Sequence, residues 1–263
     1  MTNQPTRSMT HSPTEFRGKV AWVVGASKGI GADAARAFAA RGATLVLSSR
    51  DRSGLDATAV DVRTAGGEAE VLPVDITDEA ALTKVGDDIR SRFGRLDFAF
   101  NNAGEGAQPT DLAEIPTATF DRVFEVTVRG TFLALKQEIP LMLSSGGGAI
   151  VNMSSTAGIS AFRGGASYVA AKHAIIGLTK AASIDYASRN VRVNAVAPGP
   201  IDTHRLRAAP EEYRERARSA VPMRRLGTGH EVAEAVVWLC SPASGFVTGT
   251  TLTIDGGRMA GWT

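Results

Sequence analysis

The amino-acid sequence predicts an α/β fold in which helices cover both faces of one doubly wound sheet of about seven parallel strands. Short apolar segments alternate with longer segments of helical composition along the chain, and this alternation is typical of a parallel sheet. The first apolar segment ends directly in a glycine-rich turn that precedes a helix. No internal repeat, low-complexity tract or linker interrupts the pattern, so residues 16–263 are expected to form one domain.

The expected elements follow one another with short connections. Strands are expected at residues 19–25, 44–49, 70–74, 96–100, 149–153, 191–196 and 250–254. Pro73 weakens the third strand, because proline has no N–H to donate to a strand ladder. Helices are expected at residues 31–40, 51–65, 78–93, 116–143, 165–188 and 231–239. Gly42 suits the end of the first helix, and Thr77 or Asp78 suits the N-cap of the third.

Composition and charge exclude several classes of protein. Of the 263 residues, 43% are hydrophobic and 21% are charged, and the net charge is +2. These values give no reason to expect a nucleic acid or an anionic membrane as partner. Cys240 is the only cysteine and the four histidines are scattered, so neither a disulfide nor a metal site is expected. No apolar run approaches the ~20 residues that span a bilayer, and residues 1–15 read as a flexible polar arm. We expect a cytoplasmic protein.

The glycine-rich turn is a candidate dinucleotide site. Glycines let the backbone turn tightly and approach a pyrophosphate, whose charge lies at the N-terminus of the following helix. The spacing here is G-x-x-x-G-x-G, and glycines also make ordinary turns between strands and helices. The position after the first strand favours binding, with these candidate residues: Gly25, Ser27, Lys28, Gly29, Ile30 and Gly31.

The residues after the second expected strand indicate which dinucleotide binds. An NAD site usually has a carboxylate there, which accepts hydrogen bonds from the adenosine ribose. This chain has Ser48, Ser49 and Arg50 at that place, and Asp51 comes one residue late. Arg50 can pair with a 2′-phosphate, and Lys28 supplies a second positive charge. We therefore expect NADP(H), with NAD(H) as the alternative if both cations are only solvated surface residues.

A serine, a tyrosine and a lysine form the candidate catalytic group. Tyr168 and Lys172 are four residues apart in an expected helix, so their side chains lie one turn apart on one face. An ammonium beside a phenol favours the phenolate and lowers a pKa that is ordinarily about 10. Such a phenol can donate or accept a proton near neutral pH. Taken singly, the tyrosine also fits a core aromatic and the lysine a surface charge.

With the other motifs, these groups make the chain resemble the short-chain dehydrogenase/reductase family, in its compact branch with a Rossmann-like fold. The resemblance covers residues 19–257 and rests on Gly25, Gly29 and Gly31; Asp75; the NNAG run from Asn101 to Gly104; Ser154 and Ser155; Tyr168 and Lys172; Pro198 and Gly199; and Asp255, Gly256 and Gly257. It implies that Tyr168 exchanges a proton with the substrate oxygen and also contacts the cofactor. Lys172 would assist the tyrosine and hold the nicotinamide ribose, and Ser155 would donate a hydrogen bond to the carbonyl oxygen.

The resemblance implies further cofactor contacts at the carboxyl ends of expected strands, where an open α/β sheet has its crevice. Asp75 and Ile76 match the residues that contact the adenine. Asn102, Ala103 and Gly104 match the loop near the adenosine ribose, while Asn101 could instead be structural and bond the backbone between strands. The stretch that places the nicotinamide carboxamide is matched by Pro198, Gly199, Ile201 and Thr203.

Two positions depart from the family pattern. Val24 precedes the first glycine, where the family often has a threonine that supports the turn. Thr127 stands where the family usually has an asparagine that helps to hold a water between the lysine and solvent. A threonine hydroxyl can bond an earlier backbone carbonyl and leave a similar water site. We expect activity and include Thr127 in the catalytic group, where it either keeps the proton relay or weakens it.

The sequence does not identify the substrate. Residues 202–226 are expected to form a lid, because long segments after a strand end often close over a site. The arginines of this lid would suit an anionic substrate, but the glutamates among them more simply give a solvated helix with i,i+4 ion pairs. Residues expected to border the pocket are Phe162, Arg163, residues 105–110, Met223 and Leu226.

The sequence also predicts the assembly and the function of the protein. The helix at 116–143 is apolar on several faces, so a homo-oligomer is expected, and the resemblance suggests a tetramer. The leading hypothesis is an NADP(H)-dependent oxidoreductase of a small carbonyl or alcohol. Within the enzyme class, a 3-oxoacyl-thioester reductase competes with reductases of sugars, steroids or xenobiotic ketones. A catalytically silent NADP(H)-binding regulatory protein is the alternative outside that class, and Thr127 is the feature that favours it.

Overall fold

The sheet contains seven strands that all pair in parallel, in the order β3-β2-β1-β4-β5-β6-β7. The computed structural model describes residues 15–261, except the side chain of Arg205, so residues 1–14 of the expected arm lie outside it. The strands are β1 Val20–Val24, β2 Thr44–Ser48, β3 Glu68–Val71, β4 Phe98–Asn101, β5 Gly148–Met153, β6 Val191–Pro198 and β7 Thr251–Ile254. This topology confirms the expected fold class.

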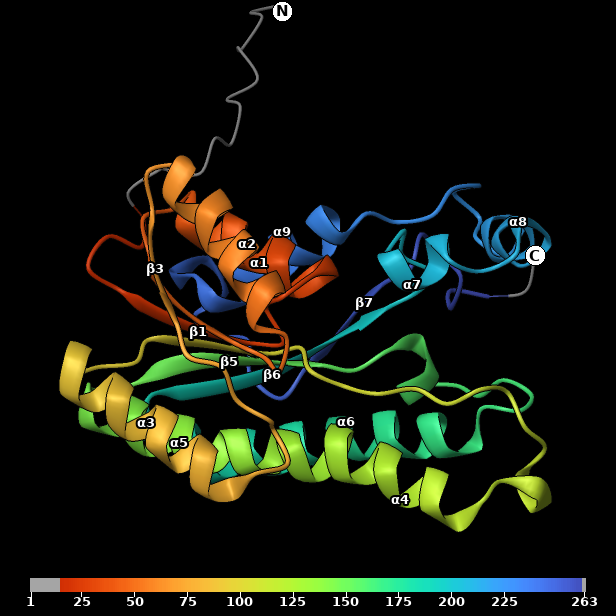
Figure 1. Ribbon diagram of the computed structural model, residues 1–263, viewed down its shortest axis with the longest axis horizontal. Coiled ribbons are helices and arrows are strands. Elements are labelled where there is room, and N and C mark those ends of the chain that lie inside the picture. Colours follow the sequence, from red (N-terminus) through yellow and green to blue (C-terminus); the bar gives the residue numbers. More distant parts are fainter. Residues whose placement is uncertain (1–14, 262–263) are drawn as a thin grey trace, which may run out of the picture.

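Helices cover both faces of the sheet. One face carries α1, α2 and α9, and the other carries α3, α4, α5 and α6 (Figure 1). The helices are α1 Gly29–Ala39, α2 Arg52–Thr64, α3 Glu79–Phe93, α4 Thr117–Phe124, α5 Gly130–Ser144, α6 Ala166–Tyr186, α7 His204–Arg207, α8 Glu211–Ser219 and α9 Gly229–Cys240. Asp51 caps α2, and Asp78 rather than Thr77 caps α3 through its bond from the Ala81 N–H.

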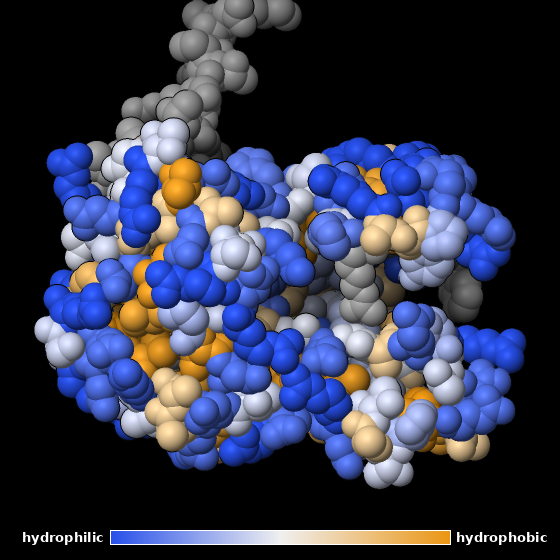
Figure 2. All heavy atoms as spheres, in the orientation of Figure 1, coloured by the Kyte–Doolittle hydropathy of each residue, from blue (hydrophilic) through white to orange (hydrophobic). Residues whose placement is uncertain are grey.

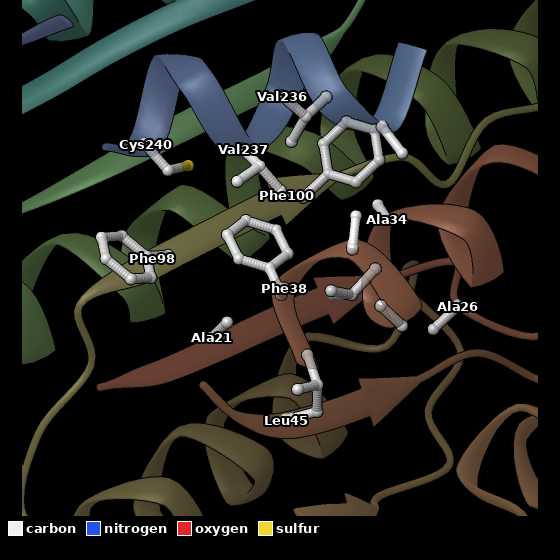
Figure 3. Close-up of a cluster of buried hydrophobic side chains, with 14 of the residues drawn as sticks. Ala21, Ala26, Ala34, Phe38, Leu45, Phe98, Phe100, Val236, Val237 and Cys240 are labelled. Carbon is white, nitrogen blue, oxygen red and sulfur yellow. The ribbon is translucent and has the colours of Figure 1, made fainter. Parts of the chain in front are cut away.

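Aromatic residues fill the core between the sheet and the α1–α9 layer. The rings of Phe38 in α1 and Phe98 in β4 stack with centroids 5.8 Å apart. Phe100 and Val236 pack beside them (Figure 3). Burial of this apolar surface holds α1 against β1 and β4, and therefore fixes the glycine turn that joins β1 to α1.

Two expected elements need correction. The third strand is β3 at Glu68–Val71 rather than 70–74, because Pro73 cannot extend the ladder. The expected helix at 116–143 is interrupted by a π-helical turn, Glu125–Arg129, between α4 and α5. The apolar residues on both sides concealed this turn, since their pattern is continuous in the sequence. Thr127 lies in it, and π turns frequently mark functional sites.

The sheet order creates a crevice beside the carboxyl ends of the strands. β1 and β4 are neighbours in the sheet, although β2 and β3 lie between them in the chain. Connections therefore leave β1 and β4 in opposite directions, and ligands of open α/β sheets bind at such a switch point. The glycine turn follows β1 and the NNAG loop follows β4. Within residues 15–261, the helices are all too short or too polar to cross a membrane.

Candidate active site

A cavity of about 670 Å³ opens at the carboxyl ends of the strands. Figure 2 shows the surface hollowed between the lobe of α7 and α8 and the part of the molecule below it. The predicted site residues that line the cavity are Lys28, Gly29, Ile30, Asn102, Gly104, Ser155, Tyr168, Lys172, Pro198, Gly199, Ile201 and Thr203. The fold thus brings residues from five separate segments of the predicted site to one place.

The glycine turn is locked against the NNAG loop. The Asn102 side-chain amide donates to the carbonyl oxygen of Gly25 at 2.8 Å. Gly25 has a φ of 88°, and a Cβ built on it would lie 2.8 Å from the Ala103 nitrogen. A Cβ on Gly31 would lie 2.0 Å from the Gly25 oxygen. Neither position accepts a side chain, so the N-terminus of α1 stays open to an anionic ligand.

The two adjacent serines have different partners. Ser154 is 2% exposed, and its hydroxyl donates to the carbonyl oxygen of Lys172 at 3.0 Å. Ser155 lines the cavity, and its Oγ accepts a hydrogen bond from the Ala157 N–H at 3.1 Å. A hydroxyl that accepts in this way still has its own O–H to donate. Both serines border the cavity, but the hydroxyl proton of Ser154 is used to tie β5 to α6, whereas that of Ser155 is left for a ligand.

Tyr168 and Lys172 lie together on the cavity side of α6. The Nζ of Lys172 is 5.7 Å from the centroid of the Tyr168 ring. Lys172 is 3% exposed, and its Nζ donates to the carbonyl oxygen of Met153 at 2.7 Å. Burial lowers the pKa of Lys172 to about 8, because the dry surroundings disfavour the ammonium. The ammonium of Lys172 can therefore exchange its proton near neutral pH. The phenol of Tyr168 borders the same cavity.

Thr127 holds the segment that follows the NNAG loop. It is fully buried, and its Oγ1 accepts from the Glu105 N–H at 3.1 Å and donates to the Glu105 carbonyl at 3.4 Å. A Cβ built on Gly104 would lie 3.3 Å from the Nζ of Lys172 and 3.6 Å from this Oγ1. Gly104 therefore leaves space between the lysine and the threonine that a side chain would fill.

The carboxyl end of β2 carries a cation rather than a free carboxylate. Arg50 is exposed, and its Nη1 lies 3.8 Å from Oδ2 of Asp75. Asp51 caps α2 by accepting from the Gly54 N–H at 3.0 Å, and this bond is the main cause of its lowered pKa. The carboxylate of Asp51 is therefore engaged by its own helix.

Several predicted residues lie outside the lining of the cavity. They are Gly25, Ser27, Gly31, Ser49, Arg50, Asp75, Ile76, Ala103 and Thr127. Ile76 is 6% exposed, with its side chain in the core. Of the residues expected to border the pocket, Glu105 and Gly106 line the cavity, whereas Phe162 lines a separate depression. Met223 and Leu226 are not among the lining residues.

Four cavity residues were not predicted as site residues from the sequence: Met153, Ser154, His204 and Ala208. Met153 reads as the last residue of an apolar strand, and only the fold brings its carbonyl to Lys172. His204 and Ala208 belong to the expected lid, in and directly after α7. In α8, Arg216 pairs with Glu212 at 3.3 Å, which confirms the interpretation of this helix as solvated.

The residues present fit a nicotinamide dinucleotide. The close approach between Gly25 and Gly31 leaves backbone N–H groups and a helix N-terminus for a pyrophosphate. Ser155, Tyr168 and Lys172 lie together in the same cavity. A hydroxyl donor and a proton-exchanging pair are the groups that can stabilise and protonate an alkoxide.

Comparisons with known proteins agree with this geometry. A family model described as enoyl-(acyl carrier protein) reductase matches residues 25–258. The A-factor type gamma-butyrolactone 1′-reductase of Streptomyces virginiae is 39% identical over 243 residues, 91% of this chain and 95% of that protein. The cis-4-hydroxycyclohexanecarboxylate dehydrogenase of Sinomonas cyclohexanicum is 39% identical over 245 residues, 93% and 98% of the two chains. A crystal structure assigned to the short-chain dehydrogenases/reductases, from Burkholderia xenovorans, has a TM-score of 0.90 at 34% identity and covers 95% of this chain and 100% of that one.

The chain belongs to the short-chain dehydrogenase/reductase family. It is an oxidoreductase that acts on CH–OH and C=O groups, as the names of its relatives indicate. Membership of this family implies use of NAD(P)(H). The resemblance seen in the sequence is thereby confirmed.

Proposed function

We propose that the protein transfers hydride between NADP(H) and an uncharged carbonyl or secondary alcohol, with Ser155, Tyr168 and Lys172 as its catalytic residues. One observation carries this proposal: the buried Nζ of Lys172 lies beside the Tyr168 ring in the cavity that Ser155 and the glycine turn also line. Arg50 and Lys28 support NADP(H), since Asp51 is occupied as a helix cap. The single cysteine supports a reducing, cytoplasmic setting.

The proposed mechanism assigns each residue one task. When bound, the reduced nicotinamide supplies the hydride. Ser155 donates a hydrogen bond to the carbonyl oxygen as negative charge grows on it. Tyr168 gives its proton to that oxygen, and the ammonium of Lys172 stabilises the phenolate that forms. Lys172 then returns a proton to the phenolate and is itself reprotonated from solvent through the space that Gly104 leaves beside Thr127. Oxidation of an alcohol uses the same groups in reverse.

The surroundings of the cavity favour a neutral substrate over an anionic one. Glu105, which lines the cavity, is paired with Arg122 at 3.3 Å, and the arginines of α8 are paired within their own helix, so these cations are already matched by carboxylates of the chain. The dehydrogenase relative acts on a hydroxyl of a cyclohexane ring that also carries a carboxylate, as its name states, so this relative supports the cyclic alcohol and not the neutral charge. A cyclic ketone or alcohol is therefore our first choice. A 3-oxoacyl thioester is the second, because a relative from Thermotoga maritima that is 35% identical over 242 residues is named a 3-oxoacyl-[acyl-carrier-protein] reductase.

Loss of NADPH absorbance with a panel of carbonyl compounds tests this function. The panel should contain cyclic ketones, a 3-oxoacyl thioester, a sugar and a steroid ketone. Turnover of a cyclic ketone with NADPH is the expected result. If the protein binds NADPH tightly and oxidises it with none of these compounds, the regulatory alternative replaces the enzymatic proposal.

Arg50 is expected to select the cofactor. Arg50→Asp should weaken NADPH binding by about 10- to 100-fold, because a charged hydrogen-bonded pair contributes about 1.5–3 kcal/mol. NADH binding should change less than about threefold, since NADH has no 2′-phosphate. Titration calorimetry with both nucleotides measures this. Arg52→Asp is the matched control, because Arg52 is an exposed arginine that pairs with Asp56. An unchanged preference in Arg50→Asp would disprove the assignment.

Thr127 is expected to act through its hydroxyl. Thr127→Val keeps the shape of the side chain but leaves the Glu105 N–H unpaired, which costs about 1–3 kcal/mol. We expect kcat to fall about tenfold, with Thr127→Ser close to wild type because it keeps the hydroxyl. Steady-state kinetics with the best substrate compare the variants. Equal kcat values for the valine and serine variants would remove Thr127 from the site.

We also propose that residues 202–226 form a lid over the cavity and that the protein is a homotetramer. Thr203 and His204 line the cavity at the start of residues 202–226, which supports a lid at this segment. Phe120 on α4 is 39% exposed and Phe132 on α5 is 47% exposed, which supports burial of this face in a homotetramer. Light scattering after size-exclusion chromatography measures the oligomeric state.

A further inference from the structure

A second group of polar side chains is buried directly next to the candidate active site. The Asn101 Nδ2 of β4 donates to Glu138 Oε2 of α5 and to Asn152 Oδ1 of β5, each at 3.0 Å. The Asn152 Nδ2 donates to Thr179 Oγ1 of α6 at 3.0 Å. Thr179 in turn donates to the Ile175 carbonyl at 2.8 Å. All four network residues are at most 2% exposed, so this network joins two strands and two helices inside the core.

The network adjoins three parts of the proposed site. Asn101 precedes Asn102, whose amide holds the glycine turn. Asn152 precedes Met153, whose carbonyl accepts the bond from Lys172. Thr179 lies seven residues after Lys172 on α6, about two helical turns along the same face. A shift of β4 against β5 in this region would therefore move the cofactor loop relative to the carbonyl that holds Lys172.

Glu138 is the member of the network whose burial costs the most free energy. A buried carboxylate without a cation loses several kcal/mol of hydration, and burial raises the pKa of Glu138 to about 8. Oε1 of Glu138 and Oδ1 of Asn101 have no hydrogen-bond partner among the described residues. Both are acceptors, and a carboxyl that keeps its proton supplies a donor that this pair lacks. A leucine would fill the position without this cost, so stability alone does not account for a glutamate here.

We propose that Glu138, as the neutral acid, is a positioning residue that sets the ends of β4 and β5 through Asn101 and Asn152. It thereby aligns the loop at Asn102–Gly104 and the carbonyl that holds Lys172. This inference rests on the proposed function only where it concerns catalysis. The alignment of the two strand ends is independent of turnover.

Two readouts test the proposal without requiring turnover: amide hydrogen exchange of peptides covering residues 101–105 and 152–156, and calorimetric affinity for NADPH. Glu138→Leu should speed exchange in both peptides at least threefold and weaken NADPH binding at least fivefold. Glu138→Gln should remain within twofold of wild type, because its amide both accepts and donates. Met142→Ala is the matched control, since Met142 is a fully buried residue one turn along α5 outside the network. It should lower the melting temperature and leave both readouts unchanged.

The outcomes separate this proposal from the enzymatic one. If Glu138→Leu behaves like Met142→Ala in hydrogen exchange, or if Glu138→Gln fails to restore wild-type exchange, Glu138 is not a positioning residue. If wild type reduces no carbonyl compound, the proposed function fails while the exchange comparison still decides the role of Glu138. Should Glu138→Leu not fold, Thr179→Val removes the other end of the network and should speed exchange at residues 152–156.

Discussion

Replacing Tyr168 by phenylalanine is expected to lower kcat for carbonyl reduction by about 10²- to 10⁴-fold, the usual contribution of a positioned general acid. The substitution removes the hydroxyl and keeps the ring, which lies 6.5 Å from the Phe162 ring and 5.7 Å from the Nζ of Lys172. Affinity for NADPH should therefore change by less than about threefold, because Lys172 and the residues of the glycine turn are unaltered. NADPH absorbance gives kcat, and calorimetry gives the affinity.

Tyr186→Phe is the matched control for this experiment. Tyr186 ends the same helix, α6, and its ring is covered by the Arg189 guanidinium at 4.3 Å. Loss of its hydroxyl should leave kcat unchanged. A Tyr168→Phe protein with more than a tenth of wild-type kcat would show that the substrate oxygen receives its proton from another group.

The second large effect concerns pH and stability. Burial raises the pKa of Glu138 to about 8 in the folded protein, whereas an exposed glutamate has a pKa of about 4.3. Between these values the unfolded chain has lost the proton that the folded chain keeps. The free energy of unfolding therefore falls as pH rises through this window, by up to about 1.4 kcal/mol per pH unit. Glutamine does not titrate in this range. The free energy of unfolding of Glu138→Gln minus that of wild type should therefore be larger at pH 8 than at pH 4.5, by on the order of 3 kcal/mol.

Urea unfolding of both proteins at several pH values between 4.5 and 8.5 measures this difference. The protein concentration must be equal throughout, because subunit association would itself change the apparent stability. Glu114→Gln is the control, since Glu114 is an exposed glutamate. A wild-type minus Glu138→Gln difference that does not vary with pH would mean that Glu138 is already ionised in the folded protein at acidic pH.

Local patterns were sufficient to predict most of the fold. Alternation of apolar strands and helices depends on residues close together in the chain, and it predicted the parallel sheet and the positions of its strands to within a few residues. The pair Tyr168 and Lys172 was also predictable, because helical geometry alone puts residues four apart on one face. The exceptions were β3, which ends before Pro73, and the π turn at Thr127. Apolar periodicity records neither feature.

The sequence by itself determined the class of the protein, because its glycine turn, its serine and its tyrosine–lysine pair lie at strand ends and on a helix whose geometry is local. Only the tertiary structure decided which groups meet. It bonded the Ser154 hydroxyl to α6 and brought the Met153 carbonyl to Lys172. It also placed Glu138 among Asn101, Asn152 and Thr179. The physical reason is that burial and hydrogen-bond partners come from segments distant in the chain, and these partners set the charge and position of each side chain.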